Sequence, residues 1–449
     1  MKKVLLINPE ESRTIWTLSG VIDDEPLDIE MVYTVLKEGK YNVRIHDVQR
    51  DEKEKIEDII KEYKPNAIFI NGVVKQVPFI LEYIRLAKNI DKNIITIIGG
   101  NYAEYNYKEL YCEELDFVSR SYDPYVILNI IKYIDGKKID LDSLNGLCYR
   151  KNEKWIETKI KPVDIQSLPI IDRTFFYKHK MKFKYMDIQP IAHIRTAYSC
   201  PYKCKFCYRT MLNSRKYSSR KIEDIVNEVK SIDCENIYFI DDDFLFDRKR
   251  LERFIELIKN EKIKKNYVCY GRVDFIINNI DIMKQLKEIG LLYVIVGLEA
   301  ANDNYLDKYN KKININDSEK CIHILENIGI RCMGLFIVDI DFTPKDFNNM
   351  YKWIKKSGLK RLGYSIYTPL PGSDLAKQYE GKYIENDLTK FDYIHTVVKP
   401  TKMSIRKFYF YYYKLVIKSF LLVKKYGTYD YIDINKWIKE FFKQIFKKK

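Results

Sequence analysis

The chain has 449 residues, and at roughly 150 residues per domain this length predicts two or three domains. Hydrophobic residues make up 46% and charged residues 31%, which is typical of a folded chain and excludes a disordered one. No apolar run reaches the roughly 18 residues of a membrane-spanning helix, and the run at 4–7 is too short for a signal peptide, so we expect a cytoplasmic protein.

The net charge is positive: 78 Lys and Arg residues against 63 Asp and Glu residues give +15. Two interpretations of this excess stay open. The first is a compositional bias toward lysine without a function. The second is attraction to an anionic partner such as nucleic acid, a membrane surface or an acidic substrate.

Residues 1–136 alternate short apolar strands with helices. Strands are expected at 4–7, 41–45, 67–70, 93–98 and 116–119, and helices at 28–37, 53–62, 77–89 and 125–134. This alternation predicts an α/β domain with a parallel, doubly wound, Rossmann-like sheet. Ligands of such sheets bind beyond the carboxyl ends of the strands, so the candidate loops are 8–11, 71–75, 99–103 and 120–123.

Residues 137–190 interrupt this pattern and are expected to form a linker with a small hairpin at 146–155. The alternation resumes over 191–373, where strands are expected at 191–196, 236–240, 267–271, 292–297, 331–338 and 361–367. The helices between them are expected near 220–232, 248–260, 280–288, 315–327 and 345–357. Six such units predict a partial (β/α)6 barrel with its chemistry at the carboxyl ends of the strands.

Residues 374–449 are aromatic and basic and are expected to be helical, with amphipathic stretches at 408–422 and 437–446. These helices could pack on the barrel, form a lid over an apolar substrate or lie on a membrane surface.

Three of the nine cysteines lie close together, at Cys200, Cys204 and Cys207, directly after the first predicted barrel strand. Thiolates at this spacing suit zinc or an iron–sulfur cluster. A structural zinc site usually has four protein ligands, and no fourth Cys or His lies close by in the loop. A four-iron cluster held by three cysteines leaves one iron open for chemistry. The other six cysteines are expected to be buried as small hydrophobic residues.

The spacing Cys-x3-Cys-x2-Cys, with Phe206 before Cys207, resembles the signature of the radical S-adenosylmethionine (SAM) enzymes. In that family the open iron of a [4Fe-4S] cluster binds SAM, and its reductive cleavage gives methionine and a 5′-deoxyadenosyl radical. The resemblance implies that SAM is bound by Phe206, Asp241, Asp242, Asp243, Arg272 and Glu299. Arg272 would pair with the SAM carboxylate, with a structural salt bridge as the alternative.

The doubly wound domain, with Gly99 and Gly100 after its fourth strand, resembles the cobalamin-binding domain of B12-dependent radical SAM enzymes. The Leu-Pro…Asp-Arg segment at 168–173 and the tail at 395–403 resemble the same group. The resemblance implies cobalamin contacts from Asn8, Asn71, Gly72, Val73, Gly99, Gly100, Tyr102 and Ser121.

Two features depart from the B12-dependent pattern. The chain has no Asp-x-His-x-x-Gly motif, and the loop after the fifth strand reads Arg120-Ser-Tyr-Asp123 where relatives carry a Gly-Glu-rich stretch. Tyr102 and Tyr122 would stack on a corrin ring or block it. The alternative is therefore a fold kept without its cofactor.

The resemblance implies a cobalamin-dependent C-methyltransferase that acts on an unactivated carbon of a small-molecule, lipid or natural-product substrate. It also implies an external one-electron donor of the flavodoxin or ferredoxin type, no specific nucleic acid, and peripheral membrane contact through the C-terminal region. The alternatives are a radical cyclase or ring-rearranging enzyme and, in another class, a zinc-stabilised basic nucleic-acid-binding protein. No catalytic residue is identified, although His193 and His395 are candidates to face the cavity.

Overall fold

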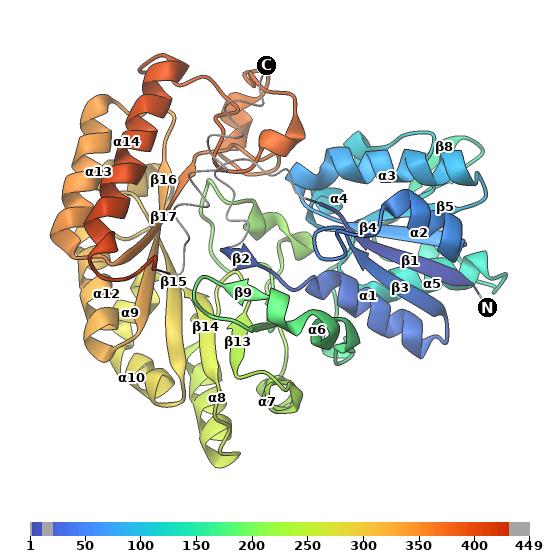
Figure 1. Ribbon diagram of the computed structural model, residues 1–449, viewed down its shortest axis with the longest axis horizontal. Helices are drawn as coiled ribbons and strands as arrows, with labels where there is room; N and C mark the ends of the chain where they lie inside the picture. The colour runs from blue at the N-terminus through green and yellow to red at the C-terminus, as the bar shows by residue number, and fades with distance from the viewer. Residues whose placement is uncertain (1, 11–20, 431–449) are drawn as a thin grey trace.

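The computed structural model (Figure 1) describes residues 2–10 and 21–430. Two α/β units lie side by side, the first drawn in blue to cyan and the second in green to orange. Glu11 of a candidate loop and the predicted amphipathic stretch 437–446 lie outside the described residues.

The first unit is built on a sheet with the strand order β3-β1-β4-β5-β6-β7-β8. Its first five strands are parallel, as predicted: β1 (Lys3–Asn8), β3 (Asn42–Asp47), β4 (Ala67–Asn71), β5 (Ile95–Gly99) and β6 (Phe117–Ser119). One face is covered by α1 (Leu27–Glu38) and α5 (Pro124–Ile134) and the other by α2 (Ile56–Tyr63) and α3 (Val77–Ile90).

Strand β1 shows why this segment folds as a central strand. Val4 and Leu6 pack in the core under α1 and α5, whereas Leu5 and Ile7 pack in the core under α2 and α3. Successive side chains of a strand point to opposite faces, so a strand covered on both sides needs an unbroken apolar run.

The hairpin predicted within the linker is part of the first sheet instead. Strand β7 (Leu147–Lys151) pairs antiparallel with β6, and β8 (Lys154–Glu157) pairs antiparallel with β7. Without it, the edge of β6 would be left open. The sequence does not reveal this pairing because it depends on which sheet edge is free in the folded domain.

The second unit is a six-stranded, all-parallel sheet in sequential order, as predicted for a partial barrel. Its strands are β10 (Ala192–Ile194), β13 (Asn236–Phe239), β14 (Asn266–Gly271), β15 (Leu291–Glu299), β16 (Arg331–Val338) and β17 (Arg361–Ile366). Its main helices are α7 (Ile222–Ser231), α8 (Arg248–Asn260), α10 (Ile280–Glu288), α12 (Ile315–Ile328) and α13 (Pro344–Ser357). The six-residue helices α9 (Val273–Asn278) and α11 (Asp303–Lys308) were not predicted, because so short a segment carries no clear periodicity.

A buried ion cluster joins the two units. In it, Arg173 Nη1 lies 2.5 Å from Glu25 Oε1, and Arg173 Nη2 lies 2.8 Å from Glu228 Oε1. Glu25 precedes α1 of the first unit and Glu228 lies on α7 of the second. Arg173 also donates to the carbonyl of His193 on β10, at 2.8 Å. The linker arginine thus fixes the first unit against the first barrel strand.

Within residues 374–430, α-helix is confined to Ile405–Lys424. Helix α14 (Ile405–Lys424) packs on α13 through Phe408, whose ring centroid lies 5.6 Å from that of Phe347. Residues 374–404 contain only two short 3-10 helices rather than the predicted longer ones.

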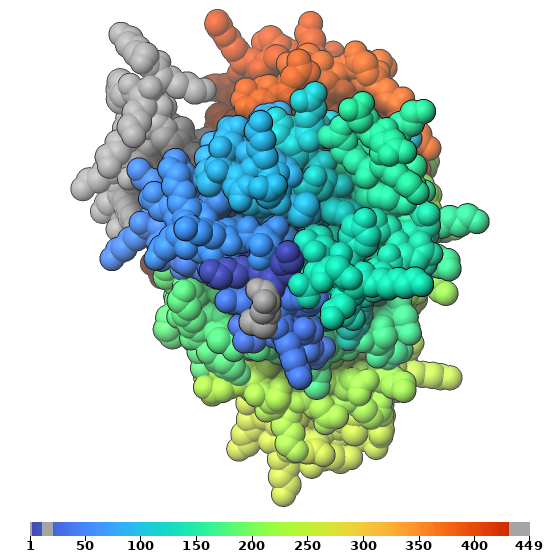
Figure 2. All heavy atoms as spheres, turned by 90° about the vertical axis from the view of Figure 1, so that its right-hand side faces the viewer, coloured from blue at the N-terminus to red at the C-terminus, as the bar shows by residue number. Residues whose placement is uncertain are grey.

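Within the described part of the chain, no helix combines the length and apolar character needed to cross a bilayer. Figure 2 views the molecule from the side of the first unit, with the yellow-green barrel helices below and the orange C-terminal segments above.

Candidate active site

The loop that carries the three cysteines begins at the carboxyl edge of the barrel. It follows the short strand β11 (Ala197–Tyr198), and Ser199 turns the chain with a left-handed φ of 64°. Asp241, at the end of β13, accepts hydrogen bonds from the backbone N–H groups of Thr196 at 2.6 Å and Ala197 at 3.0 Å, and from the Thr196 hydroxyl. Asp241 therefore holds the start of the cysteine loop and has little capacity left for SAM.

The three thiols are half-buried and free. Burial raises the pKa of the Cys207 thiol to about 12 and also raises that of Cys200. Metal binding must therefore displace protons from both. Within residues 2–10 and 21–430, no three or more His, Cys, Asp or Glu side chains are arranged to hold a metal ion.

A mononuclear structural zinc site needs four ligands that converge on one point, whereas this loop supplies three thiols. In a four-iron cluster each thiolate binds a different iron, so its ligands are farther apart. Three thiols on one loop therefore fit a [4Fe-4S] cluster with one iron free of protein ligands.

Among the predicted SAM-binding residues, Asp243 has a buried carboxylate whose two oxygens both lack a hydrogen-bond partner in the described structure. Burial raises the pKa of Asp243 to about 7, although Arg272 and Lys311 act in the opposite direction. A cationic amine placed here would relieve the cost of burying this carboxylate. Its neighbour Asp242 instead lies 3.3 Å from Arg209 Nη1.

Glu299 forms a buried ion pair with Lys311 that the sequence did not reveal. Lys311 Nζ lies 2.8 Å from Glu299 Oε1, and Glu299 has a left-handed φ of 61°. Burial is the largest single influence and acts to lower the pKa of Lys311, but the charge and hydrogen bond of Glu299 together with Cys204 outweigh it, so the pKa is raised. A Cβ at Gly297 would lie 2.2 Å from Glu299 Oε1, so only glycine leaves room for this pair.

Phe206 connects the cysteine loop to an aromatic and acidic cluster. Its ring packs edge-on against Tyr309, with the centroids 5.3 Å apart. The Tyr309 hydroxyl donates to Asp339 at 2.7 Å, and Lys308 Nζ lies 2.9 Å from the same carboxylate. Lys308, Tyr309 and Asp339 follow barrel strands in the fold but match no motif, so the sequence analysis missed them.

The predicted cobalamin loops meet at the carboxyl edge of the first sheet. Gly100 has a φ of 98°, and a Cβ there would lie 2.2 Å from Asn71 Oδ1 and 2.6 Å from the carbonyl oxygen of Gly72. Val73 N–H donates to Gln76 Oε1 at 3.0 Å, and Asn8 Nδ2 donates to Asp47 at 2.9 Å. Gly99 is buried against the Phe69 ring. The result is a tight backbone cradle at β4 and β5 that a cofactor can approach closely.

Tyr102 and Tyr122 were expected to stack on a corrin ring or to block it. Both side chains are held by contacts within the protein. Tyr102 is buried in the core under α3, and its hydroxyl donates to Glu109. Tyr122 donates to Asn101 and stacks on Tyr198, with the ring centroids 5.0 Å apart. Ser121 Oγ accepts from the Asp123 N–H at 3.1 Å and caps the turn.

The carboxyl edge of the first sheet faces the cysteine loop. Tyr105 on α4 (Asn101–Asn106) contacts Tyr208, the residue after Cys207, with the ring centroids 5.7 Å apart. Glu104 on the same helix accepts from the Ser214 N–H of the second unit at 3.2 Å. The two sets of candidate cofactor residues therefore lie on opposite sides of one interface.

Glu104 at this interface is expected to make stability depend on pH. Burial raises the pKa of Glu104 to about 7, from an ordinary 4.5. The stability gained from the bound proton is full below pH 4.5 and is lost as the pH rises through about 7. At pH 8 we expect Glu104→Gln to be more stable than the wild type by about 1–3 kcal/mol, with no such gain at pH 4.5, as measured by thermal unfolding. If Glu104→Gln differed from the wild type in stability by the same amount at pH 8 and pH 4.5, the raised pKa of Glu104 would be contradicted.

The two candidate histidines lie in different surroundings: His193 is enclosed, whereas the His395 side chain is 32% exposed. His193 is buried on β10 and packs edge-on against Tyr238, and burial lowers its pKa to about 3, which keeps it neutral. His395 Nδ1 lies 2.9 Å from Asp392 of its own turn.

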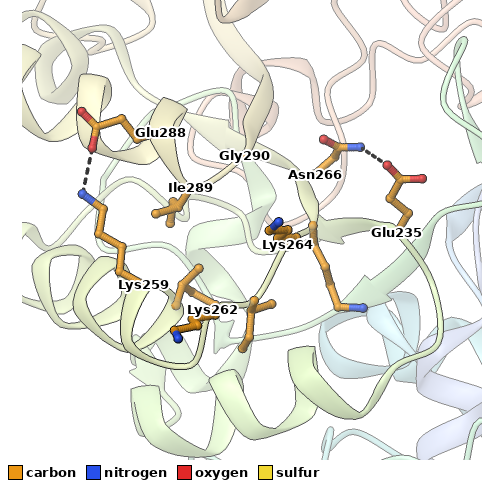
Figure 3. Close-up of a pocket in the computed structure, with 11 residues that line it drawn as sticks. Glu235, Lys259, Lys262, Lys264, Asn266, Glu288, Ile289 and Gly290 are labelled. Atoms are coloured by element: carbon orange, nitrogen blue, oxygen red, sulfur yellow. Dashed lines mark hydrogen bonds and ion pairs between the residues drawn. The ribbon is translucent and has the colours of Figure 1, made fainter.

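A cavity of about 360 Å³ lies at the opposite edge of the barrel (Figure 3). Its walls are the end of α8 and the beginnings of β14 and β15, with Lys259 and Lys264 among its lining residues. Lys259 is paired with Glu288 at 2.8 Å, as the dashed line shows. Because it lies at the amino ends of the strands, this cavity is separate from the cysteine loop.

The fold consists of a partial barrel with a three-cysteine loop at its carboxyl edge and, beside it, a doubly wound domain of the kind that binds cofactors. This combination defines a class of enzyme. Residues 194–354 match the family model of the Radical SAM superfamily, and residues 21–130 match that of the B12 binding domain. The chain belongs to the radical SAM enzymes that contain a cobalamin (B12)-binding domain. The cofactors of this class are a [4Fe-4S] cluster, SAM and cobalamin.

Two curated relatives span most of the chain. Hopanoid C-3 methylase of Methylococcus capsulatus is 23% identical over 389 residues, which are 86% of this chain and 74% of that protein. Anaerobic magnesium-protoporphyrin IX monomethyl ester cyclase of Rubrivivax gelatinosus is 25% identical over 367 residues, which are 78% of this chain and 65% of the cyclase.

Two solved structures share the fold. OxsB with aqua-cobalamin and S-adenosylmethionine bound has a TM-score of 0.67 at 16% identity. The match covers 89% of this chain but only 57% of OxsB. TsrM from Kitasatospora setae, with cobalamin and a [4Fe-4S] cluster bound, also has a TM-score of 0.67, at 15% identity, and the match covers 86% of this chain and 79% of TsrM.

Proposed function

We propose that this enzyme is a cobalamin-dependent C-methyltransferase that acts on an unactivated carbon. The observation that carries the proposal is the interface where Tyr105 of the first unit contacts Tyr208 beside the cysteine loop. The domain that would carry a methyl donor and the loop that would generate a radical thus face one another. Similarity to hopanoid C-3 methylase over most of the chain supports the same reaction.

Cys200, Cys204 and Cys207 would hold the cluster. When bound, the cluster and SAM supply a 5′-deoxyadenosyl radical and cobalamin supplies a methyl group. Asp243 would accept hydrogen bonds from the SAM amino group, because its buried oxygens have no other hydrogen-bond partner in the described structure. Asp241 fixes the start of the cysteine loop through Thr196. The buried Glu299–Lys311 pair shapes the neighbouring wall.

The substrate class is a lipid or another small molecule, with an external flavodoxin- or ferredoxin-type protein as electron donor. The second candidate function is radical cyclisation, which the similarity to the magnesium-protoporphyrin cyclase favours.

The proposed domains are 1–136, 137–190, 191–373 and 374–449, and the hairpin of the second segment is paired with the sheet of the first. Nine free thiols suit the cytoplasm, where thiols stay reduced.

The outer face of α14 is the proposed membrane contact. Phe410, Ile417 and Leu421 are 60%, 52% and 63% exposed along one stripe. The helix has no Asp or Glu, and its five basic residues are Arg406, Lys407, Lys414, Lys418 and Lys424. Apolar side chains beside basic ones favour the surface of an acidic bilayer.

Vesicle binding tests this contact. We expect the wild type to sediment with phosphatidylcholine vesicles that contain about one third phosphatidylglycerol, and the triple variant Phe410→Ser, Ile417→Ser, Leu421→Ser to bind at least about tenfold more weakly. The matched control is Ile170→Ser with Met181→Ser, two exposed apolar residues elsewhere. Equal binding by all three proteins would refute the contact.

Anaerobic reconstitution tests the proposed function without knowledge of the substrate. With iron, sulfide, SAM, a low-potential reductant and cobalamin, we expect about four irons per chain and both 5′-deoxyadenosine and S-adenosylhomocysteine. 5′-Deoxyadenosine without S-adenosylhomocysteine would overturn methyl transfer and favour the cyclase. A colourless, zinc-containing protein that yields neither product would overturn the enzyme class.

A further inference from the structure

Arg272 lies beside a cluster-binding cysteine rather than at the end of an open pocket. Its Nη1 is 3.5 Å from Cys204 Sγ, within the range of a hydrogen bond to sulfur. Arg272 follows β14, whereas Cys204 lies in the loop after β11, so the barrel brings together two residues that are 68 positions apart.

The guanidinium is held in place by several partners. Nε donates to Asp274 Oδ1 at 3.0 Å, and Nη2 donates to Asp274 Oδ2 at 3.1 Å and to the Lys311 carbonyl at 3.0 Å. The Tyr202 ring stacks on the guanidinium with its centroid 3.8 Å away. With the bond to Cys204, four of the five N–H donors of Arg272 are used. Too few remain for the forked contact with a SAM carboxylate that the sequence predicted.

We propose that Arg272 is a positioning residue that donates a hydrogen bond to the Cys204 sulfur and raises the reduction potential of the bound cluster. This inference rests on the proposed function. One electron from the external donor enters the cluster in this step, and no bond is made or broken. A cation with little contact with water favours the form that holds the additional electron. Hydrogen bonds to ligand sulfurs act in the same direction, and they are among the factors that set cluster potentials.

Asp274 and Tyr202 make this arrangement specific to arginine. The fork fits the Asp274 carboxylate on one side and directs Nη1 toward the sulfur on the other. A lysine at this position would keep the charge but could not bind both at once, because its ammonium is a single point of charge.

A redox titration followed by electron paramagnetic resonance tests the proposal on the reconstituted full chain. We expect Arg272→Gln to make cluster reduction at least tenfold less favourable, which for one electron is a shift of about −59 mV. Arg272→Lys should lie between Gln and the wild type. Arg248→Gln is the matched control, because it removes one arginine whose surface partners are Glu252 and Asp281; it should leave the potential unchanged.

An unchanged potential in Arg272→Gln would overturn the proposal, and unchanged potential with weaker SAM binding would assign Arg272 to the SAM carboxylate instead. If Arg272→Gln fails to hold four irons, Arg272→Lys decides: a potential equal to that of the wild type refutes the hydrogen bond, and a lower one supports it. Failure of the wild type to assemble a cluster would refute the proposed function itself, a result distinct from either of these.

Discussion

Replacement of Cys204 with alanine is expected to abolish both cluster assembly and formation of 5′-deoxyadenosine. Three thiols on one loop are the minimum set for a four-iron cluster that keeps one iron open. With two thiols left, nothing else in the loop can substitute, because residues 199–216 contain no further Cys and no His, Asp or Glu. Iron content, the visible absorption of the cluster and SAM cleavage measure the effect.

The matched control for this variant is Cys112→Ala. Cys112 is also a half-buried free cysteine, but it lies in the first unit, before β6. It should keep about four irons per chain and full SAM cleavage. Full turnover by Cys204→Ala, or equal losses in both variants, would refute the assignment of the cysteine loop as the cluster site.

Replacement of Arg173 with methionine is expected to cost about 3–5 kcal/mol of stability, the usual price of leaving a buried charge without its partner. Arg173 is the cation between Glu25 of the first unit and Glu228 of the second. Its loss leaves the buried Glu25 carboxylate without its cation, whereas Glu228 keeps its ion pair with Arg220. The first unit should then release from β10, which opens residues 158–173 to a protease.

Thermal unfolding and limited proteolysis measure this effect, and Arg253→Met is the matched control. Arg253 also binds two carboxylates, Glu223 and Glu256, but its side chain is 45% exposed. Exposed pairs contribute little, so we expect a change within about 0.5 kcal/mol. Similar small effects for both variants would show that the Arg173 cluster does not hold the units together.

The sequence correctly predicted those parts of the fold that repeat along the chain. The apolar run of β1 and the strand–helix alternation that leads to β10 and its successors reflect burial on one or two faces, and each segment carries that signal by itself. The cysteine motif could also be recognised in the sequence, because its three cysteines are at most seven positions apart.

The sequence could not separate the three adjacent carboxylates after β13. Successive side chains at a strand end point in different directions, so each meets a different neighbour. Asp241 faces the backbone of Thr196, Asp242 faces Arg209, and Asp243 is buried without a partner in the described structure. The burial of Tyr102 was likewise not predictable from the sequence, because it depends on how α3 and α4 pack.

The sequence by itself determined the two α/β units, the place of the three-cysteine loop after the first barrel strand and the family to which the chain belongs. Only the tertiary structure decided that the hairpin joins the first sheet, that Arg173 holds the units together and that Arg272 points at Cys204. The physical reason is the range of the interactions. Periodicity and motif spacing act within one segment, whereas these partners are tens to more than a hundred positions apart and meet only when separate elements pack.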